Sequence, residues 1–176
     1  MTKYKSFETA RLELIPTNLN DAEFIFKLLN SPKWLANIGD RNISSIDDAK
    51  KYIEEKFLTK FAQYGYSNYT VVRKTDRAKM GSCGLYTRDG IAGVDIGFAF
   101  LAQFENQGYA FESANRLKQA AFHDFNLKEL SAITTKDNKP SQKLLGKLGM
   151  KFEKYITLPN DSEELLFYKL RLSAQD

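Results

Sequence analysis

The sequence has few of the residues that cross-link a chain, bind metals or anchor it in a membrane. Its 176 residues include one cysteine, Cys83, which excludes an internal disulfide, and one histidine, His123, which has no neighbouring set of catalytic partners. There is no run of about 18 apolar residues and no basic leader followed by an apolar stretch. We therefore expect a cytoplasmic protein without a membrane segment or a metal, in which Cys83 is a small buried residue and His123 caps or packs a helix.

Two common nucleotide-binding motifs are also missing. Neither GxGxxG nor GK[ST] occurs, so the sequence gives no support to a Rossmann or a Walker-type site. Repeats, low-complexity tracts and linkers are absent, and a hydrophobic content of 43% with 13% aromatic residues favours one compact domain, residues 1–176. The formal charge of +4 and the pI of about 9.0 fit a soluble surface of mixed charge, a phosphate-bearing coenzyme or RNA.

Four helices are predicted from apolar residues spaced three and four positions apart and from the capping residues at their ends. Asn20 is expected to cap the first helix, and Ser45 with Asp48 to begin the second. Gly65 and Gly149 are expected to end helices, Gly149 in a left-handed conformation. The helices are expected at about residues 20–29, 45–64, 108–125 and 139–149, with a loop at residues 31–43.

Seven strands are predicted from short apolar segments bounded by turn residues. The short polar links TDRA and RDG are typical of hairpins, so the strands that they join should pair antiparallel. This order of strands and helices predicts an α+β fold, with a mixed, mostly antiparallel sheet and helices on both faces. The strands are expected at residues 11–15, 68–74, 80–87, 91–100, 129–135, 151–157 and 164–172.

Two segments say most about function. In IGFAFLAQFENQGYA, residues 96–110, an apolar strand leads through a turn with one glycine into a helix, and such a turn can hold a diphosphate on free backbone N–H groups. The second segment is NKPSQKLLGKLGM, residues 138–150. Together with FETARLELIP near the start, these motifs resemble the GNAT superfamily of acyl-CoA-dependent N-acetyltransferases, in particular its Rim-like branch of ribosomal-protein N-terminal acetyltransferases. The matching residues are Ile96, Gly97, Phe98, Gly108, Tyr109, Ala110, Glu112, Asn138, Ser141, Leu145 and Gly149.

The resemblance implies a GNAT-like fold with a seven-stranded sheet and a site for acetyl-CoA. In that fold the strand at residues 91–100 splays from the strand at residues 129–135 and offers its backbone groups to the pantetheine arm. A closed sheet with Gly97 as a bulge is the alternative for this strand, and a solvated face is the alternative for the helix surface around Lys143. The implied coenzyme-binding residues are Phe98, Phe100, Asn106, Gln107, Gly108, Tyr109, Ala110, Phe111, Asn138, Ser141 and Lys143.

Several positions that bear on the chemistry depart from the family pattern. Asn106 stands where the family's loop usually has its first glycine, and asparagine tolerates left-handed backbone, but Glu105 beside it would repel a diphosphate unless it turns away. Leu145 replaces a general-acid tyrosine, so Ser141 either donates a proton to the leaving thiolate or is a plain first-turn serine. Asp95, by contrast, stands at a position that is often acidic in the Rim-like branch, and it either relays the proton of the amine through water or is an exposed strand carboxylate.

The implied reaction moves an acetyl group from acetyl-CoA to a primary amine, directly within a ternary complex. Trp34 and Arg41 are expected to line the wall of the acceptor-binding pocket, where an arginine could hold a peptide carboxylate. An α-amino group of pKa about 7.7 to 8.0 is partly neutral at pH 7 and lysine hardly at all, which favours a protein or peptide N-terminus as acceptor. Polyamines or antibiotics, a non-catalytic acyl-CoA-binding module, and RNA binding through the GxxG at residues 146–149 are the alternatives, and a homodimer is an open alternative to a monomer.

Overall fold

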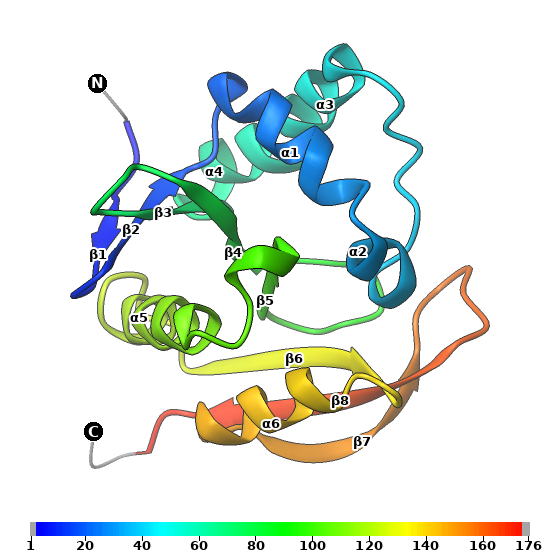
Figure 1. The fold of residues 1–176 in the computed structure, drawn as a ribbon. Helices are drawn as coiled ribbons and strands as arrows, with labels where there is room; N and C mark the ends of the chain where they lie inside the picture. Colours follow the sequence, from blue (N-terminus) through cyan, green and yellow to red (C-terminus); the bar gives the residue numbers. More distant parts are fainter. Residues whose placement is uncertain (1–2, 174–176) are drawn as a thin grey trace.

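The strands form one twisted sheet in which a single pair of neighbours is parallel. The computed structural model describes residues 3–173 and contains a sheet in the order β1-β2-β3-β4-β5-β6-β8-β7 (Figure 1). Within the described chain, β5 and β6 are parallel and every other neighbouring pair is antiparallel. The strands are β1 (Phe7–Glu8), β2 (Leu12–Pro16), β3 (Asn68–Arg73), β4 (Lys79–Tyr86), β5 (Asp95–Phe100), β6 (Glu129–Thr135), β7 (Lys151–Thr157) and β8 (Glu164–Arg171).

Helices cover both faces of this sheet. α1 and α3 lie on one side of strands β2 to β4 and α5 lies on the other (Figure 1), while α6 packs against β6 and α5. The predicted mixed α+β architecture is therefore confirmed. The helical segments are η1 (Leu19–Asp21), α1 (Ala22–Leu29), α2 (Pro32–Asn37), α3 (Ile46–Tyr52), η2 (Ile53–Leu58), α4 (Thr59–Tyr64), η3 (Ala102–Phe104), α5 (Tyr109–His123) and α6 (Lys139–Lys147).

The strand predictions differ from the structure at two places. The described sheet has eight strands rather than seven, because Phe7–Glu8 pairs with β2 and is too short to show an alternating pattern. β5 begins at Asp95 rather than at residue 91, and Gly93 just before it has a positive φ of 82° that interrupts extended backbone.

The helix predictions also need two corrections. The side chain of Asn18, not that of Asn20, caps the first helical turn, where it accepts the backbone N–H of Asn20. The expected loop at residues 31–43 contains the short helix α2, which Pro32 begins. The second predicted helix is confirmed at both ends, since the Ser45 hydroxyl accepts the backbone N–H of Asp48 and Gly65 closes α4 at φ 82°.

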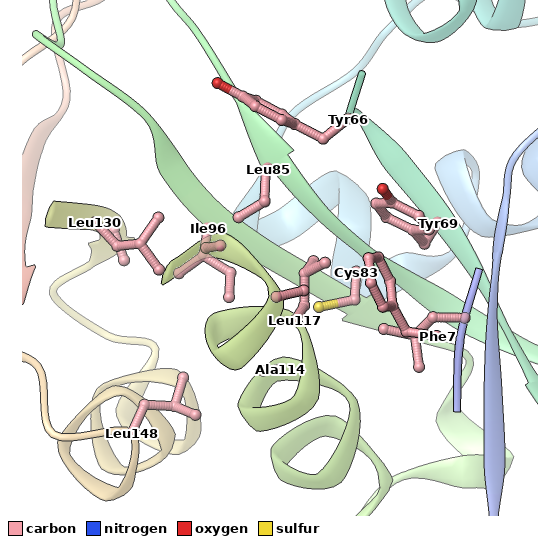
Figure 2. Packing of buried hydrophobic residues seen from close by; sticks show 14 of the residues in the cluster. Phe7, Tyr66, Tyr69, Cys83, Leu85, Ile96, Ala114, Leu117, Leu130 and Leu148 are labelled. Atoms are coloured by element: carbon pink, nitrogen blue, oxygen red, sulfur yellow. The ribbon is translucent and has the colours of Figure 1, made fainter. Parts of the chain in front are cut away.

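The main core lies between the sheet and α5. Alternate residues of β4 and β5 face this helix, and Figure 2 shows Cys83 beside Leu117, with Leu85 and Ile96 further along the two strands. Leu117 and Cys83 are fully buried. A second cluster lies on the opposite face, built on α1, α3 and η2. The two cores fix β5 from both sides, so its direction relative to α5 is rigidly set.

Burial makes Cys83 chemically inert in the folded protein. Its side chain has 0% exposure, and loss of hydration raises the pKa of the thiol to about 12. We expect an aromatic disulfide reagent to label no thiol of the native protein at pH 8 and one thiol per chain in denaturant. Release of the coloured thiolate measures both values, and rapid labelling without denaturant would contradict the buried position.

The GxxG segment does not form the loop that the RNA alternative requires. Gly146 lies within α6, and Gly149 follows that helix at φ 86° and leads directly into β7. Gly149 thus ends the helix in the left-handed conformation that was predicted. Within residues 3–173, none of the helices combines the length and the apolar character needed to cross a bilayer.

Candidate functional site

The parallel strands β5 and β6 separate almost as soon as they meet. Their register in the described chain consists of one pair, Asp95 with Ser131, and the backbone N–H of Ser131 donates to the carbonyl oxygen of Val94 at 3.0 Å. On its other side, β5 pairs with β4 over the whole length of β5. The far side of β5 beyond Ile96, from Gly97 to Phe100, therefore has no strand partner among the described residues. The predicted splay is present, and Gly97 is not a bulge, because it pairs in register with β4.

The backbone groups on the open side of β5 can be identified from its neighbours. The N–H of Leu101 donates to Met80 and so points towards β4, whereas the carbonyl of Val94 points towards β6. Successive residues of a strand point their backbone groups to opposite sides. The N–H and C=O groups of Phe98 and Phe100 consequently point into the gap left by β6. These are the two residues predicted to contact the pantetheine arm, and unpaired groups there need a partner or water.

Gly97 has a steric role on the other face of the same strand. A side-chain carbon at Gly97 would lie 3.0 Å from the ring of Tyr86, and one at Gly84 would lie 2.3 Å from it. The Tyr86 ring therefore lies over both glycines, and its hydroxyl donates to the side chain of Asn68. This arrangement gives the face of β5 opposite to α5 an aromatic lining.

The turn after β5 ends in two residues with left-handed backbone. Asn106 has φ 58° and Gly108 has φ 83°, so asparagine does adopt the conformation for which it was proposed. Gly108 is the N-cap of α5, and no side chain within residues 3–173 caps this helix. The first N–H groups of a helix have no partner inside the helix, and those of Tyr109, Ala110 and Phe111 remain available as donors. With the positive end of the helix dipole they form a site suited to a diphosphate.

Glu105 does not oppose this site as an unpaired charge. Its carboxylate forms an ion pair with the ammonium group of Lys33, from α2. On the other side of the loop, a guanidinium nitrogen of Arg73 lies 3.3 Å from the Tyr109 hydroxyl. Sequence patterns did not indicate either contact, because the partners are far apart along the chain.

The second predicted segment places its residues at the start of α6. Asn138 is the N-cap of this helix, and its side-chain oxygen accepts the backbone N–H of Ser141 at 3.2 Å. Capping is thus the role that the structure gives to Asn138, and a coenzyme contact stays a prediction. Leu145 is 1% exposed within the main core, so that position contributes no proton donor. Because α5 and α6 each follow one of two parallel strands, both helices begin at the same edge of the sheet.

Asp95 is not the exposed carboxylate that was one of its two expected roles. It is 1% exposed, and the Nε of Arg88 lies 2.8 Å from its carboxylate oxygen. Burial raises the pKa of Asp95, and the neighbouring guanidinium opposes that rise only in part. Asp95 pairs with Tyr86 in the sheet and therefore faces the side away from α5. Its proposed proton relay stays a prediction.

The two residues expected to line the acceptor-binding pocket are Trp34 and Arg41, and no described contact joins them. Trp34 lies on α2 and is partly buried against the second cluster, with an indole nitrogen that is buried and has no hydrogen-bond partner in the described chain. Arg41 is exposed. Gly90 in the β4–β5 loop packs against Pro159 in the β7–β8 loop, since a side-chain carbon at Gly90 would lie 2.5 Å from that proline. No described contact joins Arg41 to the other predicted residues, so its role also stays a prediction.

Other candidate residues lie outside this arrangement. His123 is exposed in the last turn of α5, and Lys143 is exposed on α6. Within residues 3–173 no group of three or more histidine, cysteine, aspartate or glutamate side chains could hold a metal ion. The segment between β5 and α5, residues 101–108, is the predicted phosphate loop. A shallow groove of about 550 Å³ runs along the outer side of α5 and reaches this loop at Gly108. The floor of this groove is a helix surface with no free strand edge, so the open edge of β5 and the start of α5 remain the predicted coenzyme site.

Comparisons with known proteins agree with this geometry. Residues 11–151 match the family described as "Acetyltransferase (GNAT) domain". The chain is similar to "Uncharacterized N-acetyltransferase YnaD" of Bacillus subtilis (strain 168), with 25% identity over 140 residues, 72% of this chain and 82% of the relative. It is also similar in structure to an acetyltransferase from Agrobacterium tumefaciens str. C58, with a TM-score of 0.81 and 19% identity over 98% of this chain and 97% of that chain. RimL, a ribosomal L7/L12 alpha-N-protein acetyltransferase solved in complex with coenzyme A, has a TM-score of 0.80 and 17% identity over 96% of this chain and 98% of that chain.

Proposed function

Because the chain belongs to the GNAT family of acetyltransferases, we propose that it acetylates the α-amino group of a protein or peptide while acetyl-CoA is bound beside it. Family membership makes it an acetyl-CoA-dependent acetyltransferase, and the kind of acceptor is the proposal. The observation that supports a donor site is the open edge of β5, which is followed, after η3 and a short loop, by the uncapped start of α5. The free backbone groups of the strand edge suit the thioester arm, and the N–H groups at the helix start suit the diphosphate.

The residues present can bind the donor and stabilise the charge that develops. Acetyl-CoA supplies an acyl thioester, whose carbonyl gains negative charge when an amine attacks it. Backbone N–H groups on the open side of β5, such as that of Phe98, are positioned to donate to that oxygen. The N–H groups of Tyr109, Ala110 and Phe111 bind the diphosphate end. The Ser141 hydroxyl, in the first turn of α6, is the proposed proton donor to the thiolate.

The acceptor proposal rests on the state of Asp95, a buried carboxylate at the start of β5. Asp95 is ion-paired with Arg88, so it is a weak base that can relay the proton of an amine of low pKa but is poorly suited to deprotonating a lysine side chain. An α-amino group needs little help, since roughly a tenth or more of it is neutral at pH 7, whereas a lysine side chain is neutral only to a few parts in ten thousand. RimL has the same fold at 17% identity and is a ribosomal L7/L12 alpha-N-protein acetyltransferase. This similarity supports the proposal of an α-amino acceptor.

A competition among acceptors tests this proposal. The enzyme would be incubated with acetyl-CoA and equal amounts of peptides with free N-termini, N-terminally blocked peptides with one lysine, a polyamine and an aminoglycoside. We expect mass spectrometry to find acetyl groups on the free α-amines first. Preferential acetylation of the polyamine or the aminoglycoside would replace the proposed acceptor class, and tight binding of coenzyme A with no turnover on any amine would indicate a non-catalytic module.

The Lys33–Glu105 pair gives a prediction for the donor site. Replacing Lys33 by alanine leaves the Glu105 carboxylate beside the diphosphate without its counter-charge. Because Lys33 is largely exposed, solvent screens the effect, and we expect the dissociation constant for coenzyme A to rise only about two- to threefold at low salt. Titration calorimetry measures this change. The double variant K33A/E105Q should bind like the wild type, and an equal loss in both variants would show that charge is not the cause.

A further inference from the structure

The phosphate loop is held from outside by one arginine of a distant strand. Gln107 lies between the two left-handed residues of the loop, and its carbonyl oxygen accepts a hydrogen bond of 3.1 Å from Nη2 of Arg11. Arg11 directly precedes β2, and 96 positions separate it from Gln107 along the chain. Gly108 lies equally close to this arginine, since a side-chain carbon there would be 3.3 Å from Nη2. The tightest turn of the loop is therefore packed directly against Arg11.

Several further contacts fix the guanidinium of Arg11. Its Nε lies 2.7 Å from one carboxylate oxygen of Glu112, and its backbone N–H donates to the other oxygen at 3.0 Å. The Thr9 hydroxyl donates to that second oxygen at 2.5 Å. The guanidinium carbon also lies 4.3 Å from the centre of the Tyr109 ring. Glu112 and Tyr109 belong to the first turn of α5, so Arg11 joins β2, the phosphate loop and the helix start into one unit.

The hydrogen bond to Gln107 determines where the next N–H points. The carbonyl of Gln107 and the N–H of Gly108 belong to the same peptide plane, and in a trans peptide they point in opposite directions. The described chain contains no cis peptide bond. Because the carbonyl points to Arg11, the N–H of Gly108 points away from β2. This N–H is therefore on the side of the loop away from the Arg11 guanidinium, where it can donate to a diphosphate.

The Arg11–Gln107 hydrogen bond affects the loop through its geometry rather than through the charge of Arg11. Glu112 forms a short ion pair with it, and these contacts lower the pKa of Glu112, so the pair remains charged near neutral pH. A neutralised pair contributes little long-range attraction for a phosphate. Its geometric effect on the loop is independent of salt.

We propose that Arg11 is a positioning residue for the coenzyme diphosphate, which it orients through the Gln107 carbonyl without touching the coenzyme. This inference rests on the proposed function. It requires the planar fork of the guanidinium, because one group must reach Glu112, Gln107 and the face of Tyr109 at once. A lysine at this position would keep the charge and lose the geometry.

Arg116, on α5, provides a matched control for Arg11. Its Nε donates to the backbone carbonyl of Glu8 at 3.2 Å, and its guanidinium carbon lies 4.8 Å from the centre of the Phe7 ring. Arg116 thus ties α5 to β1 much as Arg11 ties it to β2. No described contact links it to the phosphate loop. A variant of Arg116 therefore reports the effect of a lost arginine tether without a change in the loop.

The test compares two acyl donors in the variants Arg11→Lys, Arg11→Gln and Arg116→Gln. Acetyl-CoA carries the diphosphate and acetyl-pantetheine lacks it. For both Arg11 variants we expect the KM for acetyl-CoA and the dissociation constant for coenzyme A to rise about tenfold, with kcat within about twofold of the wild type. The kcat/KM for acetyl-pantetheine should not change, and Arg116→Gln should match the wild type with both donors.

Other outcomes overturn the inference in recognisable ways. Wild-type affinity in Arg11→Lys would show that only charge matters, and equal losses with both donors would show a general structural role. Unchanged coenzyme affinity in Arg11→Gln, with normal binding by the wild type, would refute the inference alone. A wild-type protein that does not bind coenzyme A at all would refute the proposed function and this inference with it.

Discussion

Replacing Gly108 by valine is expected to raise the dissociation constant for coenzyme A at least about tenfold. Gly108 has φ 83°, and a side chain there would crowd Nη2 of Arg11 at 3.3 Å. An L residue in left-handed backbone costs roughly 1–2 kcal/mol, and a β-branched one is disfavoured further. The loop would relieve this strain by turning its peptides, which would move the N–H donors at the start of α5 away from the diphosphate. Titration calorimetry with coenzyme A measures the loss.

Gly65→Val is the matched control for this variant. Gly65 has nearly the same backbone angle, φ 82°, and a side-chain carbon there would meet nothing within 4 Å. It ends α4, and Tyr66 beside it packs against Phe125, just beyond the end of α5 that is opposite to Gly108. The control should therefore lose a similar amount of thermal stability and keep its coenzyme affinity. Equal affinities in the two glycine variants would mean that the loop conformation at Gly108 does not matter for binding.

Replacing Asp95 by asparagine is expected to lower kcat about a hundredfold, the size of effect that general acid–base catalysis provides. The coenzyme affinity should not change, because Asp95 lies at the start of β5, before the open edge and the phosphate loop. Asparagine keeps the shape of the side chain and can still accept a hydrogen bond from Arg88. Steady-state kinetics at saturating acetyl-CoA and amine, with urea unfolding of the same samples, separates a catalytic loss from a loss of fold.

The pH dependence gives a second signature of Asp95. Burial raises its pKa above the ordinary value of 3.8, so the catalytically useful carboxylate is lost as the pH falls through this raised value. The wild-type rate should decline on that acidic limb, and the limb should be absent in D95N. The folded state also holds this proton to higher pH than the unfolded chain does, so the contribution of Asp95 to stability falls as the pH rises through the same range. An unchanged kcat in D95N would limit Asp95 to a structural pairing with Arg88.

Local patterns predicted most of the fold because the elements obey local rules. β6 and β7 have the predicted bounds, and the Ser45 cap and the glycines at positions 65 and 149 end their helices as expected. The errors occurred where a few residues decide the structure. A two-residue strand such as β1 has no periodicity, and α2 is a single short helix that tertiary contacts support.

The candidate site was predictable in its backbone and not in its side-chain partners. The segment from Phe98 to Phe111 combines an apolar strand, a left-handed turn and a helix start, and each of these has a local signature. Arg11, Lys33 and Arg88 were missed as partners, because pairing depends on how distant segments pack. One signal was available for Arg11. Glu112 is a charged residue in the motif beside the phosphate loop, and such a residue needs a partner when it is partly buried.

The central claim is that acetyl-CoA lies along the open edge of β5 and ends at the start of α5. Residue-resolved amide hydrogen exchange by NMR, with and without acetyl-CoA, tests it most directly. We predict that the amides of Phe98, Phe100 and Tyr109–Phe111 exchange more slowly when the coenzyme is present, while those of Gly97 and Ala99, which point to β4, change little. Unchanged exchange at Phe98 and Phe100, with new protection along the outer groove of α5, would contradict the account.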